Sequence, residues 1–139
     1  MSAYVTCKTQ FKDRDSLVQA LRDLGFVVEV NEQAVELSGY GHVSQPVQIV
    51  VRKAAQSCCL LSDAGFSRQA DGSYALVASD WDTDEHQQNF GALGQPRQNQ
   101  IKARYAYHQT VKVARAKGYS VASEKSSDGK TKLVLRRYA

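Results

Sequence analysis

The stretch that decides the fold is residues 13–30, which read DRDSLVQALRDLGFVVEV. The aspartates and the serine at its start are N-cap candidates, and Leu17, Leu21 and Leu24 then recur at helical spacing. Gly25 follows at the position where helices commonly end in a left-handed residue. The last five residues, Phe-Val-Val-Glu-Val, resume as a strand. This pattern predicts a helix that passes directly into a strand.

Working outward from this stretch, residues 4–11 form a strand-like run, so the chain opens as a β-α-β unit. Asp71-Gly72 between two further strand-like runs is a strong hairpin signal. The remaining predicted strands cover residues 36–40, 47–51, 66–69, 73–78, 119–124 and 132–137. A second helix is predicted over residues 97–117, and the polar residues 79–96 are predicted to form a loop with one short helical turn.

The two helix ends resemble each other in sequence. In both residues 20–28 and residues 113–121, the end of a predicted helix is followed by a glycine and then by a strand that begins with an aromatic residue. This similarity either reflects a sequence pattern common to many helix-to-strand connections or marks a duplicated ferredoxin-like half. The order β-α-β-β-β-β-α-β-β predicts one α+β domain over residues 1–139, with a mainly antiparallel sheet, two helices on one face and a ferredoxin-like layout.

Charge is divided sharply along the chain. Residues 96–139 hold eleven Lys/Arg and two acids, whereas residues 1–95 hold seven Lys/Arg and twelve acids. A basic end of this kind attracts an acidic partner. No apolar run approaches the roughly 20 residues of a membrane span. The N-terminus lacks the layout of a signal peptide, which predicts a cytosolic or stromal protein.

The second helix carries the candidate binding residues. A helical wheel at 100° per residue places a mostly apolar side toward the sheet, made of Ala103, Ala106, Tyr107, Thr110, Val113 and Ala114. Basic residues fall on the opposite side with Tyr105 beside them, and the last strand adds another. The candidate partner-binding residues are Arg104, Tyr105, His108, Lys112, Arg115 and Arg136. Three readings stay open for them: a solvated face, a site for an acidic protein or a membrane surface, and a nucleic-acid site.

An acidic segment, Asp80-Trp81-Asp82-Thr83-Asp84-Glu85-His86, resembles the start of a calcium loop. The match fails because the required glycine is replaced by Glu85 and the required bidentate glutamate by Gly91. The segment is therefore predicted to be a solvated turn, or an internal partner for the basic end, and no metal is predicted. Trp81 is expected to anchor inward rather than to serve as an exposed contact.

The chain offers no recognisable catalytic arrangement. The histidines His42, His86 and His108 lie in no pattern with a nucleophile, and no glycine-rich phosphate fingerprint occurs. Cys7 and the adjacent pair Cys58-Cys59 form neither a disulfide framework nor a zinc site, so reduced thiols are predicted, with a redox role for the pair as the alternative. The chain is expected to be no enzyme and to use no cofactor.

Several short motifs also occur in a fixed order along the chain. They are Lys8-Thr9, Leu17 to Gly25, Gly39-Tyr40, Val47 to Arg52, Asp63 to Phe66, Tyr74 to Asp80, Arg104-Tyr105-Ala106-Tyr107, Gly118-Tyr119 and Leu133 to Tyr138. Together they resemble the hypothetical chloroplast reading frame family, thirty-fifth in the plastid series, of cyanobacteria and algal plastids. The resemblance implies a photosynthetic setting and transfers no enzyme activity or ligand residues. Gly65 within these motifs is expected to form a turn or a bulge.

These observations predict a non-enzymatic binding or assembly-accessory protein. It would dock an acidic protein, within a photosynthesis-related complex, through the basic C-terminal face. The alternative is an RNA-binding module that uses the same residues, and a weaker third hypothesis is an enzyme with a cleft between the middle loops and the second helix. The sequence leaves the oligomeric state open.

Overall fold

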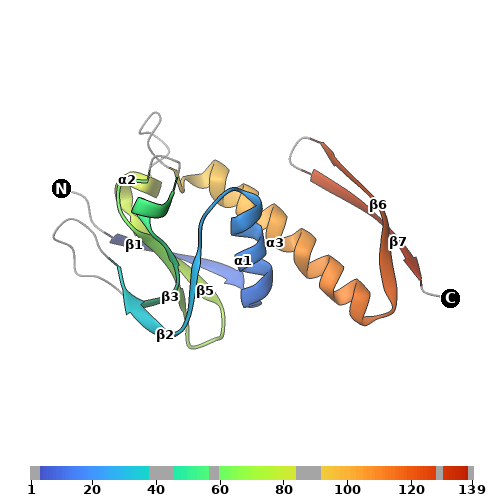
Figure 1. The fold of residues 1–139 in the computed structure, drawn as a ribbon, viewed down its shortest axis with the longest axis horizontal. Coiled ribbons are helices and arrows are strands. Elements are labelled where there is room, and N and C mark those ends of the chain that lie inside the picture. Colours follow the sequence, from blue (N-terminus) through green and yellow to red (C-terminus); the bar gives the residue numbers. More distant parts are fainter. Residues whose placement is uncertain (1–3, 38–45, 57–59, 84–91, 128–129, 138–139) are drawn as a thin grey trace.

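The computed structural model describes residues 4–37, 46–56, 60–83, 92–127 and 130–137. Its strands are β1 Tyr4–Phe11, β2 Glu29–Glu36, β3 Pro46–Val51, β4 Ala64–Arg68, β5 Tyr74–Ser79, β6 Tyr119–Ser127 and β7 Lys130–Arg137. Its helices are α1 Arg14–Asp23, the short α2 Asp80–Thr83, α3 Gln95–Ala116 and the 3-10 turn η1 Lys53–Ala55. Figure 1 shows their arrangement, with α3 as the long element that joins the two ends of the molecule.

The first five strands form one antiparallel sheet in the spatial order β1-β5-β4-β3-β2. Strands β2 to β5 are neighbours in the order of the chain, as expected for antiparallel strands with short connections. Strand β1 pairs with β5 at the far side, with Tyr4 opposite Ser79. Helix α1 therefore carries the chain across the sheet, and β1 and β2 are its two edges.

Local sequence signals account for α1 and for the β4–β5 hairpin. The Asp13 carboxylate accepts a hydrogen bond from the Ser16 amide at 3.1 Å, which caps the helix. Gly25 follows with a φ of +89°, and Gly72 in the hairpin turn has a φ of +88°. Both values lie in the left-handed region that favours glycine. The predicted helix stop and the predicted hairpin are thus confirmed.

Both long helices pack on one face of the sheet. Leu17 and Leu21 of α1 are fully buried, and Ile101 of α3 lies in the same cluster as Phe66 of β4 and Leu76 of β5. Burying such side chains contributes about 1.5–3 kcal/mol each. This cluster is the main core, and the predicted placement of two helices on one face is confirmed.

A smaller cluster of Leu37, Val47, Val50 and Val77 lies apart from the main core. Beside it, Gly65 sits inside β4, where the backbone of β3 approaches closely. A Cβ built on Gly65 would lie 2.6 Å from the Ile49 carbonyl oxygen and 2.7 Å from Cγ2 of Val47. The expectation of a turn or bulge at Gly65 was therefore wrong, because the residue is needed for close strand packing.

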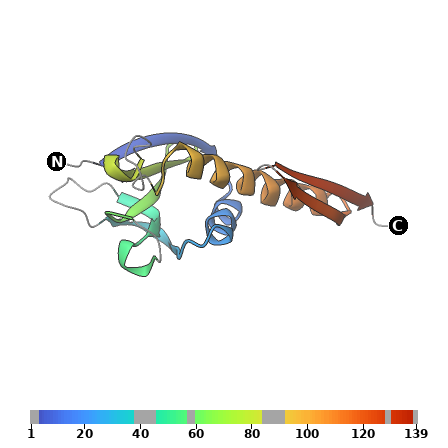
Figure 2. The ribbon, with the colours of Figure 1, turned by 90° about the horizontal axis from the view of Figure 1, so that it is seen from above.

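The chain ends in an extension that leaves the sheet. Helix α3 continues past the five-stranded sheet, and β6 and β7 form a separate two-stranded ribbon beside its second half (Figures 1 and 2). We call β6 and β7, together with the side of residues 106–116 of α3 that does not meet α1, the arm. The body comprises the five-stranded sheet, α1, α2 and the first half of α3.

The α+β class and the mainly antiparallel sheet agree with the prediction. The ferredoxin-like layout differs in one respect, because the strand after the second helix forms the separate ribbon instead of joining the main sheet. The predicted strand at residues 26–30 is shifted, since β2 begins at Glu29 while Phe26 is buried in the main core. Most of the predicted strand 36–40 lies outside the described residues.

Candidate functional site

Tyr105 ties α3 to the start of α1. Its ring packs on Phe11 with the centroids 4.6 Å apart, and its hydroxyl accepts hydrogen bonds from the amides of Lys12 at 3.1 Å and Asp13 at 3.0 Å. These amides lie at the turn between β1 and α1, where helical partners are missing. Tyr105 thus serves the packing of the body.

Ion pairs join α3 to both ends of α1. At one end, the Asp23 carboxylate lies 2.8 Å from a guanidinium nitrogen of Arg104 and 2.5 Å from Nε2 of His108. At the other end, Lys112 Nζ lies 2.7 Å from the Asp13 carboxylate. Arg104, His108 and Lys112 are separated by four residues each along the helix, so they line one face of α3.

The pKa values of the two carboxyl groups follow from these contacts. Partial burial acts to raise the pKa of Asp23, but hydrogen bonds and charge from His108 and Arg104 outweigh it and lower the pKa below its ordinary value. The pKa of Asp13 is lowered in the same way, with burial opposed by Lys112 and Ser16. Both groups are therefore held as carboxylates that neutralise basic charge on α3.

These contacts correct the helical wheel. The side predicted to face the sheet is partly open, because Ala103, Ala106 and Val113 are exposed, while Ile101 and Val111 are buried. The wheel assumed that α3 packs only on a sheet. In the structure one side of α3 packs on α1 and the body as far as Lys112, and another side lies beside the ribbon from Ala103 onward.

The structure divides the six candidate residues into two groups. Arg104, Tyr105, His108 and Lys112 come together, but on the side of α3 that meets α1. Arg115 and Arg136 are exposed on the arm, and no ion pair joins either to another residue within the described ranges. Whether any of the six binds a partner remains a prediction.

The arm is held together by polar and aromatic contacts. The Tyr107 hydroxyl donates to the Glu124 carboxylate at 2.6 Å, and the Arg104 guanidinium lies 4.3 Å from the centre of the Tyr107 ring. The hydrogen bond to Glu124, with some burial, raises the pKa of Tyr107. A shallow groove of about 530 Å³ remains between α3 and the ribbon, with Leu133 and Ala106 among its lining residues.

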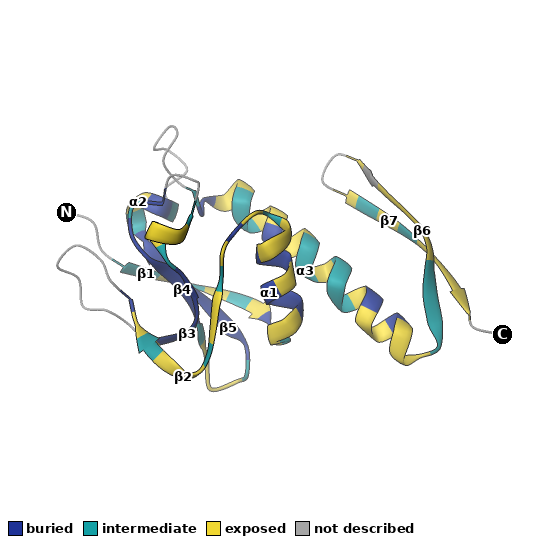
Figure 3. Cartoon of the chain, in the orientation of Figure 1, coloured by how far each residue is buried: buried dark blue, intermediate teal, exposed yellow. Residues whose placement is uncertain are grey.

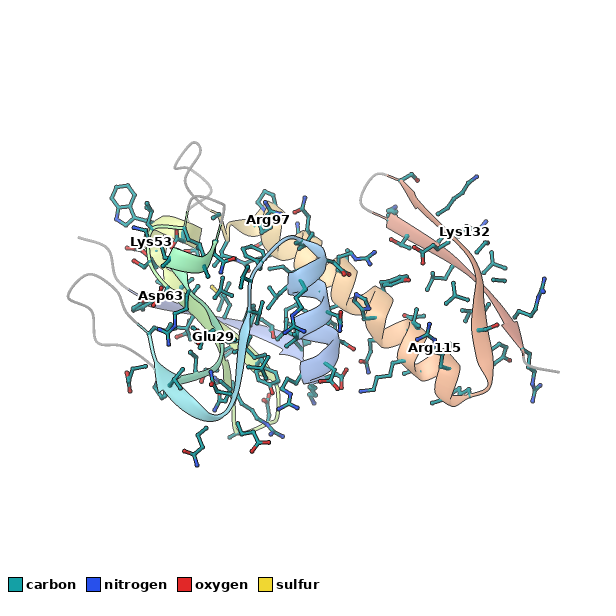
Figure 4. The ribbon with its side chains drawn as sticks, in the orientation of Figure 1. Glu29, Lys53, Asp63, Arg97, Arg115 and Lys132 are labelled. Atoms are coloured by element: carbon teal, nitrogen blue, oxygen red, sulfur yellow. The ribbon has the colours of Figure 1, made fainter. Side chains whose placement is uncertain are left out.

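The solvent-exposed surface of the arm, which we call its outer surface, carries both apolar and basic side chains. Val113, Val134 and Leu135 are 42%, 47% and 37% exposed. The arm's lysines and arginines are also exposed, and within the described residues none of the following takes part in an ion pair: Arg115, Lys125, Lys130, Lys132, Arg136 and Arg137. Figure 4 shows Arg115 on α3 and Lys132 on the ribbon. Glu124 is the acid described on this surface, and it is bonded to Tyr107.

The acidic segment has a structural role that the sequence did not reveal. Asp82 is fully buried, and its carboxylate accepts hydrogen bonds from the amides of Leu61 at 2.9 Å and Ser62 at 3.3 Å. Burial raises the pKa of Asp82, and the two amides oppose this shift. The expectation of an inward-facing Trp81 was wrong, because Trp81 is 38% exposed while its neighbour Asp82 points inward.

Other candidate residues are only partly placed. Among the described residues no group of three His, Cys, Asp or Glu side chains could hold a metal ion. Cys7 is a half-buried free thiol, and burial raises its pKa. The positions Cys58, Cys59 and Asp84 lie outside the described residues, as do two of the three histidines. The predictions about cation binding and redox chemistry at these positions therefore stay predictions.

Sequence reasoning missed the acidic partners of α3. Asp13 and Asp23 stand at the two ends of α1, ten residues apart, while the matching cations occupy α3 at four-residue intervals. This matching spacing of acidic residues on one helix and basic residues on the other could have been recognised in the sequence.

Comparison with known protein families gives a match over most of the chain. A family described as "Protein of unknown function (DUF1257)" matches residues 20–134. The chain belongs to this family. The match includes the end of α1, the sheet strands β2 to β5, α3, β6 and the first part of β7. The body and the arm are therefore both parts of the DUF1257 family match.

Two further comparisons add no relative. No curated protein and no solved structure matches this DUF1257 chain. Among the described helices, none combines the length and apolar character needed to cross a lipid bilayer.

Proposed function

We propose that this DUF1257 protein is a non-enzymatic binding or assembly-accessory protein that docks an acidic partner protein through its arm. The observation that carries the proposal is the face of β7 on which Lys132, Val134 and Arg136 alternate; all three are exposed, and neither cation is in an ion pair within the described residues. Apolar anchors surrounded by charge of one sign suit a complementary protein surface.

The contrast with the body side of α3 supports this assignment. Arg104, His108 and Lys112 are matched by acids of α1, so a partner would have to compete with Asp13 and Asp23 to reach them. Arg115 and Arg136 have no such competition within the described residues. Of the candidate residues, these two are the primary contacts in the proposal.

The form of the ribbon gives further support. An isolated two-stranded ribbon is marginally stable in water unless a further strand or a helix covers it. Here α3 covers part of the ribbon, and within the described residues of β6 and β7 no side chain is buried. A partner that covers the outer surface would add the missing burial. The sequence resemblance to a plastid and cyanobacterial family supports a setting in the cyanobacterial cytosol or plastid stroma.

A pull-down with matched variants tests the proposal. Tagged protein is used to recover partners from its own cell lysate, in nuclease-treated and untreated halves, and the partners are identified by mass spectrometry. The arm variant combines Arg115→Glu, Lys132→Glu and Arg136→Glu. The control combines Arg22→Glu and Arg68→Glu, which reverse exposed charges on the body.

The proposal expects partners with acidic surfaces that persist after nuclease, are retained by the control and are lost by the arm variant. Partners that are lost after nuclease treatment would instead indicate that the arm binds RNA. In that case, affinity for a single-stranded RNA oligonucleotide should fall steeply with salt, because bound cations are released. If the arm variant retains the same partners as the control, the arm does not bind them and the proposal fails.

A further inference from the structure

A groove larger than the one between α3 and the ribbon lies in the body, away from the outer surface of the arm. It is an open groove of about 950 Å³ between β1 and α3. Its floor is apolar, formed by Phe11, Phe66, Leu76, Ile101 and Tyr105, which also belong to the main core or pack against it. An apolar floor with polar walls is the usual construction of a binding site.

The walls of this groove are rich in amide side chains. Gln10 of β1 faces Gln95, Gln98, Asn99 and Gln109 of α3 across it. Several of these amides use one polar group internally: Gln98 donates to the Leu93 carbonyl, and Gln109 accepts from the Ser16 hydroxyl. Since each amide offers both a donor and an acceptor, capacity remains for a ligand that itself carries amides.

Strand β1 forms one side of the groove and is an edge of the sheet. Among the described strands β1 pairs only with β5, so its other side is not covered by a strand. Figure 2 shows β1 along the border of the molecule beside the first half of α3. An exposed edge beside a helix can receive an extended peptide, whose backbone adds a strand while its side chains enter the groove.

The length of the groove suits a peptide. The lining residues of α3 run from Gln95 to Thr110, which spans about 22 Å along a helix. An extended chain of about seven residues covers this distance. A compact small molecule would fill only part of it.

Charge defines the occupant further. The lining contains Lys8 on the strand side and Lys102 on the helix side, and no acidic residue. Both lysines lack an ion pair within the described residues. A second copy of β1 fits poorly, because it would bring a second Lys8 to the edge and because the β1 register is irregular between Cys7 and Phe11.

We propose that the groove between β1 and α3 binds an extended acidic peptide segment of a partner protein. The segment adds to the edge of β1, places apolar side chains on the floor and places its carboxylates beside Lys8 and Lys102. This site is independent of the proposed docking surface on the arm, and either can fail without the other.

A displayed library of random peptides, each of about twelve residues so that it exceeds the groove length, provides the probe. Selection on the full-length chain is expected to enrich peptides that alternate apolar residues and contain Asp or Glu. The selected peptides are then titrated against four variants. Asn99→Trp fills the groove wall, whereas the control Gln100→Trp alters the next exposed position, which does not line the groove.

Asn99→Trp, and separately Lys8→Glu combined with Lys102→Glu, should weaken binding at least about tenfold, while Gln100→Trp should leave it unchanged. Hydrogen exchange should slow at the β1 amides when peptide is bound. Lys132→Glu combined with Arg136→Glu on the arm should have no effect, which separates this site from the arm. No enriched peptides, enrichment without acidic residues, or binding insensitive to the groove variants would overturn the proposal.

Discussion

The body and the arm use the same helix in different ways. On the body side, residues of α3 meet a core in which Leu17 and Leu21 are completely buried. On the arm, only Val111 and Ala114 of α3 are buried, and no described residue of the ribbon is (Figure 3). The body can therefore draw its stability from its own core, whereas the ribbon depends on α3 and on what covers its outer surface.

The same division separates the basic residues of the C-terminal part. Those that meet α1 are paired with Asp13 and Asp23, and those on the arm form no ion pair among the described residues. Net charge along a sequence is therefore a poor guide to available charge. Only the cations left without internal partners can attract a ligand at little cost.

The largest expected effect separates the two regions directly. Leu17→Ala removes a fully buried side chain and should lower the free energy of unfolding by about 2–5 kcal/mol. Leu135→Ala on the ribbon, where the side chain is 37% exposed, should cost about 1 kcal/mol or less. Urea denaturation of both variants measures the difference. Equal losses would mean that the ribbon shares a core with the body, and the comparison would fail.

Gly65 tests how tightly the sheet of the body is packed. Gly65→Ala forces the new Cβ against the Ile49 carbonyl and the Val47 side chain, so β3 and β4 must separate, at a cost of about 2–3 kcal/mol. Gly72→Ala is the matched control, because it meets no atom within 4 Å and suffers only from its positive φ. Its cost should be about 1 kcal/mol. A Gly65→Ala protein as stable as the control would argue against the close approach of the strands.

Much of this architecture could be predicted because its signals are local. The cap at Asp13, the stop at Gly25 and the turn at Gly72 depend on residues within one or two turns of chain. The strand order and the separate ribbon could not be read, since pairing of β1 with β5 depends on contacts about seventy residues apart. Local sequence signals do not specify which distant strands pair with each other.

The candidate site shows the same limit. The basic character of α3 was read correctly from the sequence, but its orientation was not, because a wheel orders residues around an axis without naming the neighbours. The acids of α1, and not the sheet, determine the direction of Arg104 and Lys112. Asp82 was similarly read as part of a solvated turn, whereas its backbone partners at Leu61 and Ser62 lie twenty or more residues away.

Asp82 gives the next smaller effect and tests the body alone. Asp82→Ala leaves the amides of Leu61 and Ser62 without their acceptor, which should cost about 2 kcal/mol. Glu32→Ala, an exposed position on β2, should be neutral and serves as the control. Thermal unfolding compares the two. An unaffected Asp82→Ala protein would show that other acceptors satisfy these amides.

The smallest expected change in stability concerns the ion pairs between α1 and α3. The direction of its pH dependence follows from the pKa of Asp23. The folded pKa of Asp23 is lowered, so its contribution to stability is present above the unfolded value near 3.9 and is lost as the pH falls through the folded value. Asp23→Asn should therefore lower the free energy of unfolding by about 1 kcal/mol near neutral pH, a modest amount because the pair is partly exposed to solvent.

In strong acid the wild-type protein and Asp23→Asn should become equally stable, because the carboxyl is then neutral in both folded and unfolded chains. Asp15→Asn on the same helix is the matched control, since the Asp15 side chain is 78% exposed and lies 3.9 Å from its Arg14 partner. Urea midpoints measured across acidic pH distinguish the two variants. If the wild-type protein and Asp23→Asn differ by the same amount at every pH, the junction depends on shape and not on charge. The cations of α3 that meet α1 would then be as available to a partner as those of the arm.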